Sequence, residues 1–187
     1  MNVFYRGLDN PVAISAGGVA ESDVSVGITS PHSIRKLKAG SYVVKPGTRG
    51  ENATVTVYAT VDGKREVMGS SPFRIKDLPT PIAKITGSRG GQANLRVGDL
   101  VALQIVEAEA EDFLFEVEFE VITFTMGFVD ASGIWASKKS DGKNFTSEMK
   151  GLFRTMKPGQ RITLQDIKAS GPDGKVRPLS PINITVR

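Results

Sequence analysis

The segment from Phe113 to Met126, FLFEVEFEVITFTM, constrains the fold most because its apolar side chains alternate with polar ones and then change phase. Apolar residues hold the odd positions up to Val121 and the even positions from Ile122 onward. Alternation with a period of two is typical of a strand with one buried face, and a phase change of one residue turns every later side chain to the opposite face. We therefore predict a long strand that is bulged or bent near Val121 and Ile122 and crosses from one sheet to another.

Short apolar runs rich in Val, Ile, Thr and Phe recur along the rest of the chain, separated by ten prolines and twenty glycines. Short strands with frequent turn signals are typical of β-sandwiches. A chain of 187 residues can form one large domain or two small ones, each with its own core. These features favour an all-β chain of two consecutive β-sandwich domains.

The clearest strand of the first half is Ala53 to Thr60, in which small apolar residues alternate with Thr and Tyr. Asp62-Gly63 follows it and predicts a type I′ hairpin turn, because both central residues of that turn need positive φ. The returning strand is expected at Glu66–Met68 or at Phe73–Lys76.

Two prolines, Pro79 and Pro81, mark the boundary between the domains. Proline cannot donate to a ladder and biases the preceding residue toward extended conformations. We expect a first domain over residues 1–79 and a second over residues 80–187, joined by a short, stiff linker.

One short helix is expected in the second domain, where Met149, Leu152, Phe153 and Met156 follow helical spacing. Thr146 or Ser147 is available as its N-cap, and Pro158-Gly159 would end it. The apolar run from Leu100 to Val106 is expected to be a further strand.

Composition excludes several classes of function. The chain has no cysteine, which removes disulfides, thiolate chemistry and Cys-based zinc sites. It also has no apolar run of about 18 residues, the minimum for a membrane-spanning helix, and no N-terminal targeting pattern. The basic residues are dispersed and lack interleaved aromatic residues, so nucleic acid is not an expected partner.

Candidate chemical residues are few. His32 is the single histidine, and no cysteine or second imidazole could complete a metal site or a catalytic triad with it. Glu116, Glu118 and Glu120 would lie on one strand face, roughly 7 Å apart. A solvated face, or cross-strand pairs with residues such as Arg161, explains this row better than a calcium site or a hydrolase, which needs convergent carboxylates in a pocket. We assign no catalytic, cofactor-binding or metal-binding residues.

Three strings resemble a known family: MNVFYRGLDNPVAIS at the start, FRIKDLPTPIAKITG from Phe73 to Gly87, and MKPGQRITLQDIKASGPDGKVRPLSPINITV from Met156 to Val186. They are similar to the C-terminal periplasmic part of the GldM/PorM family of the type IX secretion and gliding machinery of Bacteroidetes. The resemblance spans nearly the whole chain. It implies two Ig-like β-sandwich domains and a non-enzymatic structural role.

The resemblance also implies partners and a location. Such proteins are homodimeric shafts in the periplasm, anchored by an upstream inner-membrane helix that meets a motor partner, and they reach toward outer-membrane-associated ring proteins. A rigid strut that transmits force or conformation to this ring is the leading hypothesis. The alternatives are an Ig-like module that binds glycan or peptidoglycan at an aromatic groove, with Tyr58 and Trp135 as candidates, and an enzyme that uses the glutamate row.

The candidate docking residues lie around the Asp141-Gly142 turn of the second domain. Tryptophan is enriched at binding hot spots, and loops at the ends of sandwiches commonly bind partners. On this basis we expect protein contacts at Trp135, Lys138, Lys139 and Lys143, although Trp135 fits a core position equally well.

Overall fold

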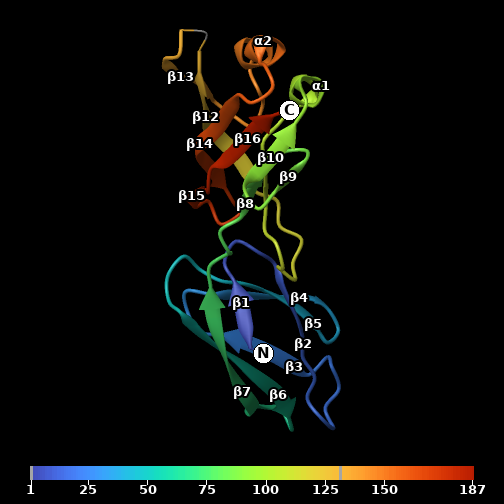
Figure 1. The fold of residues 1–187 in the computed structure, drawn as a ribbon. Coiled ribbons are helices and arrows are strands. Elements are labelled where there is room, and N and C mark those ends of the chain that lie inside the picture. Colours follow the sequence, from blue (N-terminus) through green and yellow to red (C-terminus); the bar gives the residue numbers. More distant parts are fainter. Residues whose placement is uncertain (1, 131) are drawn as a thin grey trace. The chain divides into compact units, whose positions relative to one another are not determined.

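Strands form most of the regular structure in the computed structural model, which describes residues 2–130 and 132–187 (Figure 1). The chain divides into two units, Met1–Leu78 and Pro79–Arg187, each with its own sheets and core. The expected all-β, Ig-like architecture is confirmed.

The first unit is a sandwich of two sheets. One sheet has four strands in the order β1-β7-β6-β3, and the other has three in the order β2-β5-β4. The strand bounds are β1 Val3–Tyr5, β2 Asn10–Ala13, β3 Val24–Ile28, β4 Ser33–Lys38, β5 Ser41–Lys45, β6 Asn52–Val61 and β7 Lys64–Lys76.

Side chains from both sheets form the core of this unit. Its buried members are Phe4, Val44, Ala53, Val55 and Ile75. Phe4 stacks on Phe73 with 4.2 Å between ring centroids. The alternation seen in the sequence therefore points Ala53 and Val55 inward, as expected for β6.

The β6–β7 hairpin contains the predicted turn. Asp62 and Gly63 have φ values of 49° and 77°, so both central residues lie in the left-handed region that a type I′ turn requires. The returning strand is one element of 13 residues that includes both expected ranges. A bulge at Met68 keeps the two strands paired, because Val57 lies opposite Gly69 while Tyr58 lies opposite Val67.

The first and last strands of this unit, β1 and β7, pair in parallel. Val3, Phe4 and Tyr5 lie opposite residues 74, 75 and 76. The ladder extends at both ends: the Arg74 N–H donates to the Asn2 carbonyl at 3.0 Å, and the Arg6 N–H donates to the Lys76 carbonyl at 2.9 Å.

The second unit is built on one seven-stranded sheet. Its order is β13-β12-β14-β16-β10-β9, with β15 paired to β14, and β8 and β11 form a separate two-stranded sheet. The bounds are β8 Ile82–Lys84, β9 Ser88–Arg89, β10 Gln92–Leu95, α1 Val97–Ala102, β11 Glu107–Glu109, β12 Glu120–Val129, β13 Trp135–Ser140, α2 Ser147–Thr155, β14 Arg161–Ser170, β15 Val176–Pro178 and β16 Ile182–Val186.

The long predicted strand is only half present. β12 begins at Glu120, so residues 113–118 are not a strand, and the expected crossing between sheets is wrong for β12 itself. Asp112 has a φ of 55°, which ends any extended run there, and Phe119 makes a single bridge to Ala108 in β11. The predicted bulge is confirmed, because pairing with β14 shifts register on both sides of Thr123.

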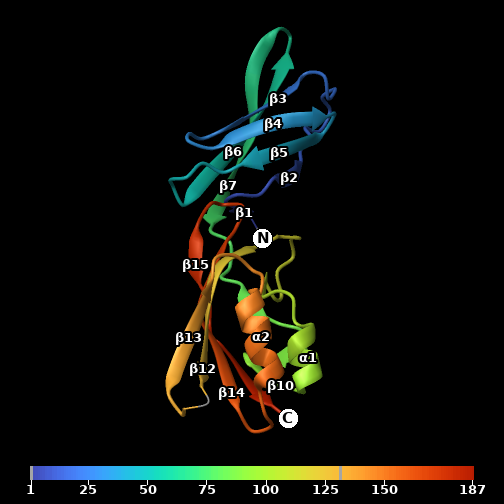
Figure 2. The ribbon, with the colours of Figure 1, turned by 90° about the horizontal axis from the view of Figure 1, so that it is seen from above.

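Two helices cover one face of the sheet, where one was expected (Figure 2). The predicted helix is α2: the Thr146 hydroxyl accepts a hydrogen bond from the Met149 N–H, and Met149 and Phe153 are buried. The other, α1, takes the first part of the run that was expected to be a strand. Asp99 accepts a hydrogen bond from the Arg96 N–H at its start.

Candidate interaction site

The four residues expected to bind a partner lie on or just after β13, an edge strand of the seven-stranded sheet. Trp135 is 54% exposed, so it is a surface residue and not part of the core. Because side chains alternate along a strand, Trp135 and Lys139 lie on one face of the sheet and Lys138 on the other. Lys143 follows the strand in a loop.

The lysines do not form one patch with Trp135. Lys138 pairs with Glu148 at 2.8 Å, and its hydrogen bond holds the pKa of the Glu148 carboxyl below its usual value. Lys139 pairs with Asp141 at 2.7 Å. Lys143 lines a groove beside glutamates instead. Two of the three charges are therefore neutralised within the chain.

The Trp135 indole packs closely against Gly127 of the neighbouring strand. A Cβ atom added to Gly127 of β12 would come within 2.2 Å of the indole Cζ2 atom, so the ring covers the glycine directly. The registered pairs Gly127–Ser137 and Val129–Trp135 make this a diagonal contact on the face opposite the helices. Glycine at position 127 therefore leaves the room that the indole occupies.

The β12–β13 hairpin carries further exposed apolar residues. Val129, which lies opposite Trp135, is 45% exposed, and Ile134 is 64% exposed. We call Val129, Ile134 and Trp135 the hairpin tip. A hollow of about 520 Å³ lies beside it, with Phe128, Leu152 and Met156 in its lining, and we call this the tip groove. Of these residues the sequence had indicated only Trp135 as a contact, although the Ile-Trp pair after Gly133 was a usable signal.

A second groove, of about 850 Å³, has acidic walls. Glutamates 107, 109, 118 and 120 line it together with Lys143, and its buried lining includes Val106 and Val121. Of the predicted glutamate row only Glu120 belongs to a strand, and it lies opposite Ser170 and not Arg161. Among the described residues no group of three acidic or histidine side chains could hold a metal ion.

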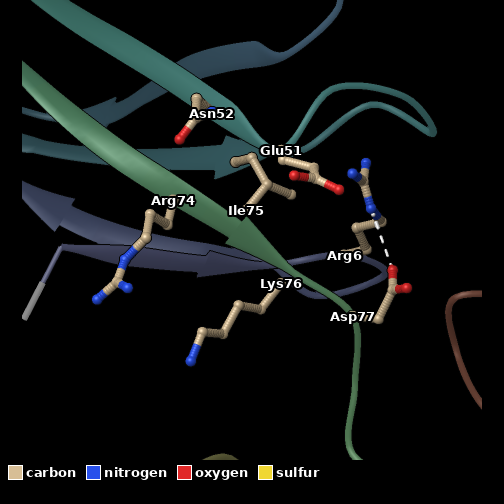
Figure 3. Close-up of a pocket in the computed structure, with 7 residues that line it drawn as sticks. All are labelled: Arg6, Glu51, Asn52, Arg74, Ile75, Lys76 and Asp77. Atoms are coloured by element: carbon tan, nitrogen blue, oxygen red, sulfur yellow. Dashed lines mark ion pairs between the residues drawn. The ribbon is translucent and has the colours of Figure 1, made fainter.

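A third hollow, of about 520 Å³, lies in the first unit beside the β1–β7 pair (Figure 3). Arg6 points toward Asp77 and forms an ion pair with it at 3.1 Å. The same guanidinium donates to the carbonyls of Gly47 and Gly50. Arg6 therefore ties a turn and the end of β7 together, which is a structural task.

His32 and Tyr58 also have structural contacts. His32 is buried: its Nδ1 accepts from the Gly47 N–H at 3.1 Å, and its Nε2 lies 3.1 Å from the Asn52 carbonyl. The Tyr58 ring is covered by the Arg65 guanidinium at 3.6 Å and belongs to the first unit. Tyr58 and Trp135, the two aromatic residues proposed for glycan stacking, therefore belong to different units. Neither unit contains a groove lined by both.

Curated proteins and solved structures do not identify the family of this chain. No helix among the described residues is both long and apolar enough to cross a bilayer. No curated protein matches the chain. Of the solved structures, the adhesin InvE of Yersinia pseudotuberculosis is similar over 99% of this chain and 56% of its own, at 14% identity and a TM-score of 0.27.

The family comparison covers both units. Residues 1–76 match the family model described as the GldM third domain, and residues 79–187 match the one described as the GldM C-terminal domain. Together the two matches span nearly the whole chain. The chain therefore belongs to the GldM/PorM family and comprises its third and C-terminal domains.

Proposed function

We propose that this chain is the non-enzymatic distal part of a periplasmic shaft, which transmits force or conformation from an inner-membrane motor to an outer-membrane-associated protein ring. Family membership makes it a structural component of the type IX secretion and gliding machinery. The motor would be reached through upstream segments with a membrane helix, and the shaft would be a homodimer. The stiffness of the linker around Pro79 and Pro81 stays a prediction.

The parallel pairing of β1 and β7 supports the force-bearing role most directly. These strands lead into and out of the first unit, and they lie side by side in the same direction. Tension that pulls the two ends of the unit apart would slide one strand along the other. All hydrogen bonds between them would then resist together, instead of breaking one after another from one end.

The surrounding contacts strengthen this pair. Phe4 of β1 is buried and stacks on Phe73 of β7, so sliding would also break an apolar contact. The ion pair between Arg6 and Asp77 joins the chain segments that follow the two strands. Side chains and backbone therefore oppose the same displacement.

Single-molecule force spectroscopy tests this role. The chain has no cysteine, so introduced cysteines give unique attachment points. Handles at Asn2 and Leu78 load the β1–β7 pair in shear, whereas handles at Asn2 and Asp62 peel β1 from β7. We expect a rupture force several times higher in the first geometry. Equal forces would refute a load-bearing role for this pair.

Two further experiments test the assembly. Deletion of residues 79–187 from the full-length protein is expected to abolish type IX secretion in the source bacterium. Light scattering of the full-length shaft is expected to give the mass of a dimer. Normal secretion after the deletion would contradict the docking role, and a monomer at high concentration would contradict the homodimer.

A further inference from the structure

Exposed apolar side chains concentrate at the hairpin tip. Among the described residues ten large hydrophobic side chains are exposed, and three of them, Val129, Ile134 and Trp135, fall within seven positions of one hairpin. Singly scattered apolar residues on a surface are ordinary, whereas a contiguous group marks an interaction site. Of the other seven, Val61, Val67 and Met68 lie in the β6–β7 hairpin of the first unit, and the remaining four are scattered over β4, β12, β15 and the loop at Leu114.

Hydrogen bonds hold the described residues of the loop that joins the two strands. The Asp130 carboxylate accepts hydrogen bonds from the Ser132 N–H at 2.8 Å and the Ile134 N–H at 3.0 Å. The Asp130 N–H donates to the Ile134 carbonyl at 2.8 Å. With Trp135 held against Gly127, the tip is organised before any partner arrives, which lowers the entropic cost of binding.

The tip groove supplies a concave surface next to this convex one. Phe128 and Met156 are buried in its lining, and Val129 and Leu152 add further apolar surface. Its polar lining residues include Lys157 and Gln160. The groove opens on the helix side of the sheet, whereas the Val129 and Trp135 side chains lie on the opposite face. The groove and the tip therefore meet at the end of β12, where one partner segment could pass over Val129 and contact both.

Unpaired positive charge surrounds the site. Lys157 lines the groove, and Arg161 lies beside Val129 because Phe128 is registered opposite Ile162. Arg154 stands in the last turn of α2. None of these three cations has an ion pair within the described part of the chain. The one acid in the groove lining, Asp130, already accepts two backbone N–H groups.

We infer that the hairpin tip and the tip groove bind an extended segment of a partner protein that alternates apolar and acidic residues. Apolar side chains of the segment would fill the groove and contact the tip. Its carboxylates would pair with Lys157 beside the groove and with Arg161 on the face that carries Trp135. This inference rests on the proposed function, since it names the surface by which the second unit docks. A membrane fits less well, because the Trp135 indole is packed against Gly127 and a bilayer would leave the groove unfilled.

Peptide binding to the whole 187-residue chain tests the inference. Three fluorescein-labelled eight-residue peptides serve as probes: alternating Leu and Glu, alternating Leu and Lys, and alternating Ser and Glu. Fluorescence anisotropy should show binding of the Leu-Glu peptide, with at least tenfold weaker binding of the other two. Equal affinity for the Leu-Glu and Leu-Lys peptides would remove the electrostatic half of the inference, and no binding of the Leu-Glu peptide would overturn it.

Matched variants locate the binding surface. Ile134→Glu and Lys157→Glu are each expected to weaken binding of the Leu-Glu peptide at least tenfold. Val176→Glu is the control, because Val176 is 54% exposed, close to the 64% of Ile134, but lies on β15. Circular dichroism verifies that each variant is folded. An equal loss in the Val176 variant, or preferential binding of the wild type to vesicles of anionic phospholipid, would refute the assignment.

A cellular experiment separates this inference from the proposed function. The full-length protein with Ile134→Glu is expected to lose secretion while its abundance stays normal. If this variant still secretes and deletion of residues 79–187 does not, the surface is wrong and the proposed function stands. If both still secrete, the docking role of the second unit fails as well.

Discussion

The contact between Gly127 and Trp135 leads to a quantitative expectation. In Gly127→Ala the new Cβ would lie 2.2 Å from the indole Cζ2 atom, which is far inside van der Waals contact. The backbone of β12 is held by pairing on both sides, with β13 and β14. The exposed indole is freer to move, so we expect the ring to lift off the sheet.

The size of the effect follows from the area that the ring covers. Trp135 is 54% exposed, so just under half of its surface is buried. For a side chain of roughly 250 Å² this is about 110 Å², or about 3 kcal/mol at ~25 cal/mol per Å². Regained rotamer freedom, about 1 kcal/mol, and partial re-packing reduce this value. We expect Gly127→Ala to lower the free energy of unfolding by about 1–2 kcal/mol.

A double-mutant cycle isolates this contact. Urea unfolding followed by circular dichroism gives the free energy of unfolding for wild type, Gly127→Ala, Trp135→Ala and the double variant. In the Trp135→Ala background the alanine at position 127 should cost almost nothing. Because the chain has one tryptophan, emission of Gly127→Ala should also shift to the red. The same cost in both backgrounds would refute the reasoning.

Three other expectations concern stability. Asp173 and Arg177 form a buried pair that lowers the pKa of the Asp173 carboxyl, so Asp173→Asn should cost roughly 3–5 kcal/mol at neutral pH. The pKa of the Asp173 carboxyl is lowered in the folded protein, so the difference in unfolding free energy between wild type and Asp173→Asn should have its full size above pH 3.8, the ordinary pKa. It should shrink as the pH falls below that value. Urea titrations at several pH values will measure it. Phe153→Ala, in the core under α2, should cost about 3–5 kcal/mol in urea unfolding; a cost under 1 kcal/mol would contradict its packing. Gly63→Ala should lower the free energy of unfolding by about 1 kcal/mol, because the φ of Gly63 is +77°. Gly151→Ala should raise it by a similar amount, because Gly151 lies in helix α2 with open space around it. Thermal melts in which these signs are reversed would contradict the backbone conformations at the two positions.

Local chemistry explains which elements the sequence predicted. The Asp62-Gly63 turn and the Thr146 cap each depend on neighbouring residues, so their signals lie within a few positions. The bulge after Val121 could also be predicted from neighbouring residues. The apolar positions change there from odd to even, which is visible within a few residues. These features need no knowledge of a distant partner.

Features that depend on distant residues were missed or misplaced. Residues 113–118 alternate like a strand, yet they lie outside every strand, because alternation alone does not decide which residues join a ladder. The run at Leu100 became helix α1 because Asp99 stabilises its start. The sequence grouped Trp135 with three lysines, but the ion pairs of Lys138 and Lys139 and the groove beside α2 appear only after folding.

The segment from Phe113 to Glu118, which lies outside every strand, has a consequence for how the chain avoids aggregation. Its sequence has the alternation of a strand, and its residue Leu114 is 95% exposed. Segments of this kind can pair with identical segments of other molecules. In a parallel, in-register stack, however, Glu116 and Glu118 would each face their own copies, and like charges directly opposite repel. The same glutamates that carry no catalytic role can therefore keep neighbouring molecules from joining edge to edge.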